Sequence, residues 1–255
     1  MRYETLTVER DGAIAHVWLN RPQRLNALNT EALEELIAVF DALQTTHEVQ
    51  AIVLGGRGSS FCAGADRTDP PGRLPPEAGT VARARRWASQ LGRRVLEAIE
   101  RAEAITVARL HGHVIGGGVV LAVACDLRIA ADSTQLLIPE VELGVPLTWG
   151  AVPRLAAIVG PARAKELILL GEHVGAVAAE RYGLVSRVVP AQELDDAVRA
   201  VAERLASQPP WAVHMTKSQF RAYAQAQRLG DVTEADGDWL AAATAEDPTR
   251  FRWRR

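Results

Sequence analysis

The 255-residue sequence contains only two cysteines, Cys62 and Cys125, and they lie far apart along the chain. So few cysteines exclude a disulfide framework and favour a reducing compartment, so we expect a cytoplasmic protein. Neither cysteine belongs to a CxxC pair or to a zinc-ligand spacing, and no other cluster has metal-binding spacing. The sequence therefore predicts no metal site.

Long hydrophobic runs and an excess of one charge are also missing. The longest apolar run, Val114–Cys125, is too short and too rich in glycine to span a bilayer. The 29 basic and 31 acidic residues give a net charge of −2. This balance offers no general attraction to nucleic acid or to an anionic membrane, so neither is an expected partner. The patterns GxxxxGK[ST], GxGxxG, HExxH and GxSxG are absent as well, which excludes several common nucleotide-binding and hydrolytic sites.

Strands and helices are predicted to alternate as far as about residue 190, which indicates a layered α/β fold. A hairpin is expected around Asp11-Gly12, and a surface loop over the proline-rich residues 68–76. After Pro190 only helices are predicted. We therefore expect a core of residues 1–190 and a C-terminal helical region of residues 191–255. The other elements expected are helices from about Thr30, Val81–Glu103, Gly117–Ala124, Asp195–Leu205, Trp211–Tyr223 and Glu234–Ala245, and strands Ala51–Leu54, Ile105–Leu110, Leu127–Ala130 and Gln135–Ile138.

Two glycine-rich turns each follow a predicted strand. The first is Gly55–Asp66, and the second is Ile115–Val119, which leads into an apolar helix. Small residues let a ligand approach the backbone, and the start of a helix presents free N–H groups. One donor from each turn could form an oxyanion hole. Close packing of strand against helix explains the glycines equally well, so both interpretations remain open here.

Two carboxylates, Glu140 and Glu142, lie in an otherwise apolar stretch, residues 136–146. A carboxylate against apolar walls has a raised pKa and can transfer protons near neutral pH. The alternative is that either side chain simply points into solvent from a loop. Taken alone, each residue favours the exposed position.

The chain resembles the enoyl-CoA hydratase/isomerase, or crotonase, family. The resemblance implies a crotonase (ClpP-like) fold of repeated ββα units, with a C-terminal helical region that builds homotrimers, often paired into hexamers. It also implies an acyl-CoA thioester as substrate, so that coenzyme A is part of the substrate and no separate cofactor is expected. The stretches that carry the resemblance, in family order, are residues 21–29 (RPQRLNALN), 61–66 (FCAGAD), 112–118 (GHVIGGG), 139–144 (PEVELG) and 183–190.

The resemblance also assigns residues to roles. The backbone N–H groups of Ala65 and Gly117 match the oxyanion-hole positions, and Glu140 matches a catalytic glutamate. Lys217 resembles a late lysine near the nucleotide phosphates, although a solvated helical lysine is an equal alternative. The remaining positions matched to acyl-CoA binding are Leu25, Ala27, Ala63, Asp66 and Gly116.

Two departures from the family pattern decide which reaction we expect. Hydratases of the family use a second glutamate, at the position that is Val120 here, and Thr148 stands where some relatives carry an aspartate. Moving a double bond from the 3 to the 2 position needs only one carboxylate, so isomerisation of a 3-enoyl-CoA is the first hypothesis. Enoyl-CoA hydration is the runner-up, with Glu142, Asp69 or Glu77 replacing the missing glutamate. A non-catalytic acyl-CoA-binding protein is the third.

Overall fold

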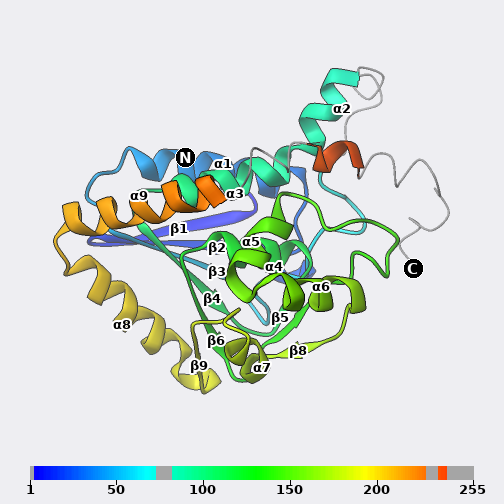
Figure 1. Ribbon diagram of the computed structural model, residues 1–255. Coiled ribbons are helices and arrows are strands. Elements are labelled where there is room, and N and C mark those ends of the chain that lie inside the picture. The colour runs from blue at the N-terminus through cyan, green and yellow to red at the C-terminus, as the bar shows by residue number, and fades with distance from the viewer. Residues whose placement is uncertain (1–2, 73–81, 228–234, 240–255) are drawn as a thin grey trace.

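The computed structural model describes residues 3–72, 82–227 and 235–239, and two sheets organise them (Figure 1). In the larger sheet the strand order is β1-β2-β3-β4-β6-β9, and every neighbouring pair is parallel except β1 and β2. In the smaller sheet β7 lies between β5 and β8. The bounds of the strands are β1 Leu6–Asp11, β2 Ile14–Leu19, β3 Ala51–Gly56, β4 Ile105–Leu110, β5 His113–Ile115, β6 Leu127–Ala131, β7 Gln135–Leu137, β8 Val174–Gly175 and β9 Arg187–Val189.

The predicted hairpin forms, with its turn one residue later than expected. Asp11 pairs with Ile14, so the two turn residues are Gly12 and Ala13. Gly12 has a φ of 55°, a conformation that costs glycine little. Two strands followed by a helix then recur along the chain, as β1-β2-α1, β4-β5-α4 and β6-β7-α5. This confirms the expected α/β class and its repeated units.

Most of the helices pack on one face of the larger sheet, around the main hydrophobic core. Helix α1 begins after Asn29, whose side chain accepts a hydrogen bond from the Ala32 N–H and so caps the helix. Helix α4 consists entirely of buried residues. The bounds on this side are α1 Thr30–Gln44, α3 Leu91–Arg101, α4 Gly117–Ala124, α5 Ala151–Val159, α6 Pro161–Leu170 and α7 Ala176–Arg181.

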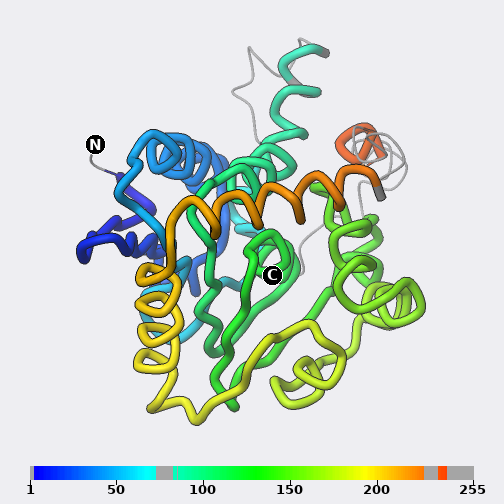
Figure 2. Tube along the Cα trace, turned by 60° about the vertical axis from the view of Figure 1, so that its left-hand side comes forward, coloured from blue at the N-terminus to red at the C-terminus, as the bar shows by residue number. Residues whose placement is uncertain are grey.

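The opposite face of the larger sheet is covered by α8 (Leu194–Ala206). Leu194, Val198 and Ala202 form a second core with residues of the strands. Helix α9 (Pro210–Gln227) follows and runs across the molecule (Figure 2). Residue 190 therefore separates the last strand from the C-terminal helices, but α8 is part of the packing of the sheet. The domain boundary itself stays a prediction.

The arginine-rich helix predicted over 81–103 is two helices, α2 (Ala82–Ser89) and α3. The helix is interrupted at Gln90, where the Trp87 carbonyl accepts hydrogen bonds from the Gln90 N–H and the Arg94 guanidinium. Trp87 is 65% exposed, and α2 projects from the rest of the molecule in both views (Figures 1 and 2). The predicted helix 234–245 lies largely outside the described residues. Within the described ranges, no helix has the length and hydropathy needed to cross a bilayer.

Candidate active site

The two glycine-rich turns lie against each other. The Cys62 N–H donates to the His113 carbonyl over 3.1 Å, and the Ile115 N–H donates to the Cys62 carbonyl over 2.9 Å. Gly64, with a φ of 87°, permits this approach. A Cβ atom on Gly64 would lie 2.8 Å from the Ile115 carbonyl oxygen and 3.6 Å from the amide nitrogen of Gly117. Close packing thus requires glycine here, and it also brings the two candidate donor turns together.

Neither Ala65 nor Gly117 donates its backbone N–H to an acceptor within the described part of the chain. The neighbours of Ala65 are paired: the Leu28 N–H donates to the Gly64 carbonyl over 2.8 Å, and the Asp66 N–H donates to the Leu28 carbonyl over 2.7 Å. Gly117 is the first residue of α4, where a helix leaves its N–H groups unpaired. Two free donors on touching turns suit an oxyanion. Their assignment to that role stays a prediction from the resemblance.

Glu140 lies at the same place. A Cβ atom on Gly116 would be 2.6 Å from Oε1 of Glu140, so the carboxylate packs directly against this glycine. Gly116 has a φ of 49° and donates its N–H to the Leu137 carbonyl over 2.8 Å. This bond ties the end of β7, and the glutamate that follows it, to the start of α4. The acidic group and the two candidate donors therefore occupy one small region.

The environment of Glu140 favours the protonated carboxyl group. Burial raises its pKa from 4.5 to about 7, opposed by the hydrogen bond from its own backbone N–H. Its Oε2 atom is buried without a hydrogen-bond partner among the described residues. A carboxyl group with a pKa near 7 can both accept and donate a proton at neutral pH. The alternative of a solvated side chain is wrong for Glu140 and right for Glu142, which is exposed.

Val120 is 3% exposed and packs in the main core. The position of the second glutamate in hydratases is therefore apolar and filled, and Thr148 is buried too. Of the carboxylates considered as replacements, Asp69 accepts a hydrogen bond from the Asn29 side chain over 3.0 Å. Glu77 lies outside the described residues.

The segment 21–29 packs against the first glycine turn. The Ala63 N–H donates to the Leu25 carbonyl over 2.9 Å, and Leu25 is partly exposed, with a φ of 49°. Ala27 is half-buried. Leu25, Ala27 and Ala63 thus lie beside the candidate oxyanion hole, and their contact with a substrate stays a prediction.

Asp66 ties these two segments together. Its Oδ2 lies 2.8 Å from the Arg21 guanidinium, and its Oδ1 accepts hydrogen bonds from the backbone and hydroxyl of Thr68. Burial acts to raise the pKa of Asp66, but the bonds from Thr68 and Arg21 outweigh it and the pKa is lowered. Asp66 therefore stays ionised and holds the shape of the loop.

Lys217 is not a solvated helical lysine. It is 8% exposed, and its ammonium group contacts Asp126 Oδ2 at 2.7 Å and the Ala104 carbonyl at 2.8 Å. These contacts fasten α9 to the end of α4 and to the segment before β4. The phosphate-binding role implied by the resemblance stays a prediction, and within the described chain this lysine already has two partners.

Trp149 is a residue of the site that the sequence reasoning missed. Its indole Cζ3 would lie 3.0 Å from a Cβ atom on Gly117. The residue has a φ of 62°, which is unusual for a tryptophan. No local signal identifies it, because the contact joins two segments that are distant in sequence.

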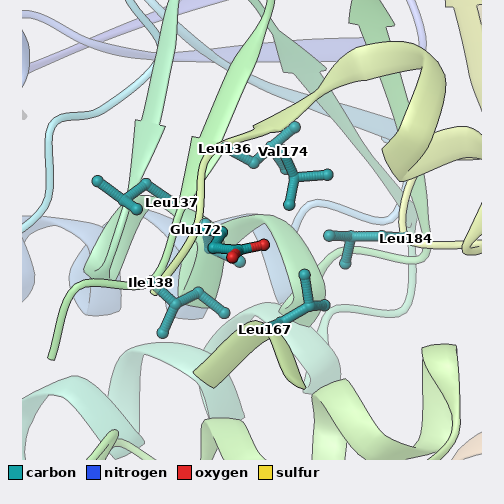
Figure 3. Close-up of a pocket in the computed structure, with 8 residues that line it drawn as sticks. Leu136, Leu137, Ile138, Leu167, Glu172, Val174 and Leu184 are labelled. Carbon is teal, nitrogen blue, oxygen red and sulfur yellow. The ribbon is translucent and has the colours of Figure 1, made fainter. Parts of the chain in front are cut away.

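A separate small apolar pocket is lined by residues of α4, α6, β7 and β8 (Figure 3). Figure 3 shows Glu172 among the lining side chains, and this residue is exposed. The pocket does not include Glu140, Ala65 or Gly117, so it is distinct from the cluster described above. The lining residues are Val119, Leu136, Leu137, Ile138, Leu167, Glu172, Val174 and Leu184.

A family model described as enoyl-CoA hydratase/isomerase matches residues 9–251. The chain belongs to the enoyl-CoA hydratase/isomerase family. The short-chain-enoyl-CoA hydratase of Clostridium acetobutylicum is 33% identical over 251 residues, which is 97% of this chain and 94% of that protein. These matches confirm the family that the sequence motifs indicated.

Solved structures agree with this membership. The crystal structure of an enoyl-CoA hydratase from Mycobacterium avium subsp. paratuberculosis matches with a TM-score of 0.85 and 27% identity, over 98% of this chain and 93% of that one. A monofunctional enoyl-CoA isomerase from M. smegmatis matches with a TM-score of 0.70 and 27% identity, over 88% of this chain and 96% of that one. The fold is the crotonase fold, and the family acts on acyl-CoA thioesters.

Proposed function

We propose that this member of the enoyl-CoA hydratase/isomerase family converts a 3-enoyl-CoA into the 2-enoyl-CoA isomer, with Glu140 as both acid and base. The observation that carries the proposal is the Glu140 carboxyl group against Gly116, with a pKa of about 7. The buried Val120, at the position of the second glutamate of hydratases, supports it. Coenzyme A enters as part of the substrate, so the reaction needs no separate cofactor.

The reaction conserves atoms and charge with one carboxylate. Glu140 removes a proton from Cα, and the electrons of that C–H bond enter a dienolate. The oxygen of the dienolate accepts hydrogen bonds from the N–H groups of Ala65 and Gly117. Glu140 then delivers the proton to Cγ, which moves the double bond into conjugation with the thioester. A positioned acid–base group of this kind typically accelerates a reaction by about 10²–10⁴-fold.

Enoyl-CoA hydration is the second candidate, and the names of the compared proteins favour it. The Clostridium relative and the M. avium structure are both called hydratases. Hydration needs one group to activate water and one to protonate Cα. With valine at position 120, Glu140 would have to do both, or a carboxylate from another segment would have to assist.

The test is to incubate the purified protein with a 3-enoyl-CoA and, separately, with a 2-enoyl-CoA, and to identify products by chromatography and mass spectrometry. Isomerisation predicts a 2-enoyl-CoA of unchanged mass from the first substrate. A gain of one water by the 2-enoyl substrate, at an equal or higher rate, would favour the hydratase. Tight binding without either product would favour the non-catalytic acyl-CoA-binding protein.

We also propose that the protein assembles as a homotrimer, or as a hexamer of two trimers. Helix α9 supports this with large apolar side chains that face solvent in the single chain. Several large apolar side chains exposed along one helix are typical of a protein–protein contact. The residues are Trp211, Met215, Phe220 and Tyr223, with exposures of 75%, 43%, 70% and 64%.

A further inference from the structure

Trp149 occupies a strained position that its surroundings hold in place. Its φ of 62° costs a non-glycine residue roughly 1–2 kcal/mol. The next residue is fixed at both of its backbone polar groups, because the Gly150 N–H donates to Asp236 over 2.7 Å and the Gly150 carbonyl accepts from Arg154 over 2.8 Å. Arg154 is itself buried and bonded through two nitrogens to Glu100, each at 2.7 Å. Strain that is held this firmly is typical of functional positions.

The indole ring passes between α3 and the start of α4. A Cβ atom on Gly92 of α3 would lie 2.0 Å from Cδ2 of the ring, so the ring fills the space that a side chain of α3 would take. At the other end of the ring, Cζ3 and Cη2 would lie 3.0 and 3.3 Å from a Cβ atom on Gly117. The position of the ring therefore requires glycine at position 92, while a Cβ atom on Gly117 would press on the ring and need a shift of a few tenths of an ångström.

The ring and the acidic group flank the same turn. Gly117, whose N–H is the second proposed oxyanion donor, faces the indole, while its neighbour Gly116 faces Glu140. Leu28 completes the apolar side, since its Cδ1 would lie 3.2 Å from the same Gly117 Cβ atom. A thioester held by Ala65 and Gly117 would therefore have its first acyl carbons between a carboxylate and an apolar wall.

We infer that Trp149 is a specificity-determining residue whose indole forms the wall of the acyl site beside Gly117 and limits the acyl group to short, unbranched chains. The inference rests on the proposed binding of an acyl-CoA thioester at this turn. The rigid attachment of Gly150 keeps the ring from swinging aside, so a longer or branched chain meets a fixed surface. Such a pocket discriminates by size, and each methylene typically changes specificity by about 10–200-fold.

The experiment compares the wild type with Trp149→Ala and Trp149→Phe in two assays. One is the kcat/KM for 3-enoyl-CoA substrates of increasing chain length. The other is calorimetric binding of butanoyl-CoA and decanoyl-CoA, which cannot react. The inference predicts that the wild type prefers the shorter chain in both assays. In Trp149→Ala, the ratio of kcat/KM for long over short chains, and the same ratio of binding constants, should rise at least about tenfold. Trp149→Phe should give intermediate ratios.

Val152→Ala is the local control, because Val152 is 45% exposed three residues away. Its chain-length ratio should match the wild type. An unchanged ratio in folded Trp149→Ala or Trp149→Phe would overturn the inference. A changed binding ratio without turnover of any enoyl substrate would support the inference and count against the proposed isomerase, so the two failures can be told apart.

Discussion

At the scale of single residues, two opposing effects act on Glu140. The hydrogen bond from its own backbone N–H stabilises the ionised carboxylate and lowers its pKa. Burial acts the other way and is stronger, since raising the pKa from 4.5 to about 7 corresponds to a penalty on the ionised form of about 3 kcal/mol. Desolvation therefore decides the protonation state, and the carboxyl group is close to half-protonated at neutral pH.

This penalty predicts a pH-dependent cost in stability. The folded protein binds the Glu140 proton more tightly than the unfolded chain does, so the stability from this group is full below pH 4.5 and is lost as the pH rises through 7. Glu140→Gln removes the ionisation. In urea unfolding, the variant should gain about 2 kcal/mol more over the wild type at pH 8 than at pH 5. A difference that does not change with pH would contradict this.

The contacts of Lys217 inside the protein predict a structural contribution that can be tested against the phosphate-binding role. Removing its ammonium group leaves the partly buried Asp126 without a counter-ion, so Lys217→Ala should lower the free energy of unfolding by about 3 kcal/mol. The affinity for coenzyme A should stay within about twofold, because both contacts lie inside the protein. Lys165→Ala removes an exposed lysine and is the control. A selective tenfold loss of affinity with normal stability would instead support the phosphate role.

At the scale of elements, the parts of the site with a local signature were predictable. Glycine turns after buried strands and a carboxylate in an apolar stretch both follow from short segments of sequence. The interruption of the helix at Gln90 was not predictable, because arginines suited to a helix stand on both sides of it and no glycine or proline stands at that position. The burial of Lys217 and the insertion of Trp149 depend on partners distant in sequence, so no local pattern could reveal them.

The turn before α4 also predicts the effect of one added methyl group. Gly116→Ala would place its Cβ 2.6 Å from Oε1 of Glu140, so kcat should fall at least about tenfold as the carboxylate is displaced. Gly12→Ala is matched, because Gly12 has a similar φ and no atom within 4 Å of the added Cβ. Gly116→Ala should lose more stability in thermal unfolding, because Gly116 combines its φ of 49° with a ψ of −113°, which alanine rarely adopts. Equal turnover in the two would show that Gly116 matters only for its backbone conformation.

At the scale of the whole molecule, helices cover both faces of the larger sheet. The α/β class and the C-terminal helices followed from patterns along the chain, and the repeated units were expected only from the family resemblance. The place of α8 did not, because an amphipathic helix after the last strand can cover a sheet or extend from it. In the structure it covers one face of the larger sheet, while α9 leaves several large apolar side chains exposed.

The exposed apolar side chains of α9 predict self-association. Replacing Phe220 and Tyr223 together with glutamate should convert the proposed trimer or hexamer into a monomer, because both side chains face solvent in the single chain. Light scattering after size-exclusion chromatography measures the mass directly. Val8→Glu, at a partly exposed apolar residue of β1, should leave the assembly unchanged. A monomeric wild type, or an unaffected assembly in the double variant, would contradict the proposal.

The central claim is that Glu140 performs the proton transfers on a thioester bound beside Gly117. The most direct test measures kcat and the dissociation constant of an unreactive acyl-CoA for the wild type and Glu140→Gln. The account predicts a loss of kcat for 3-enoyl-CoA of at least about 10²-fold, with affinity unchanged within a few-fold. Turnover by Glu140→Gln within about tenfold of the wild type would contradict the claim.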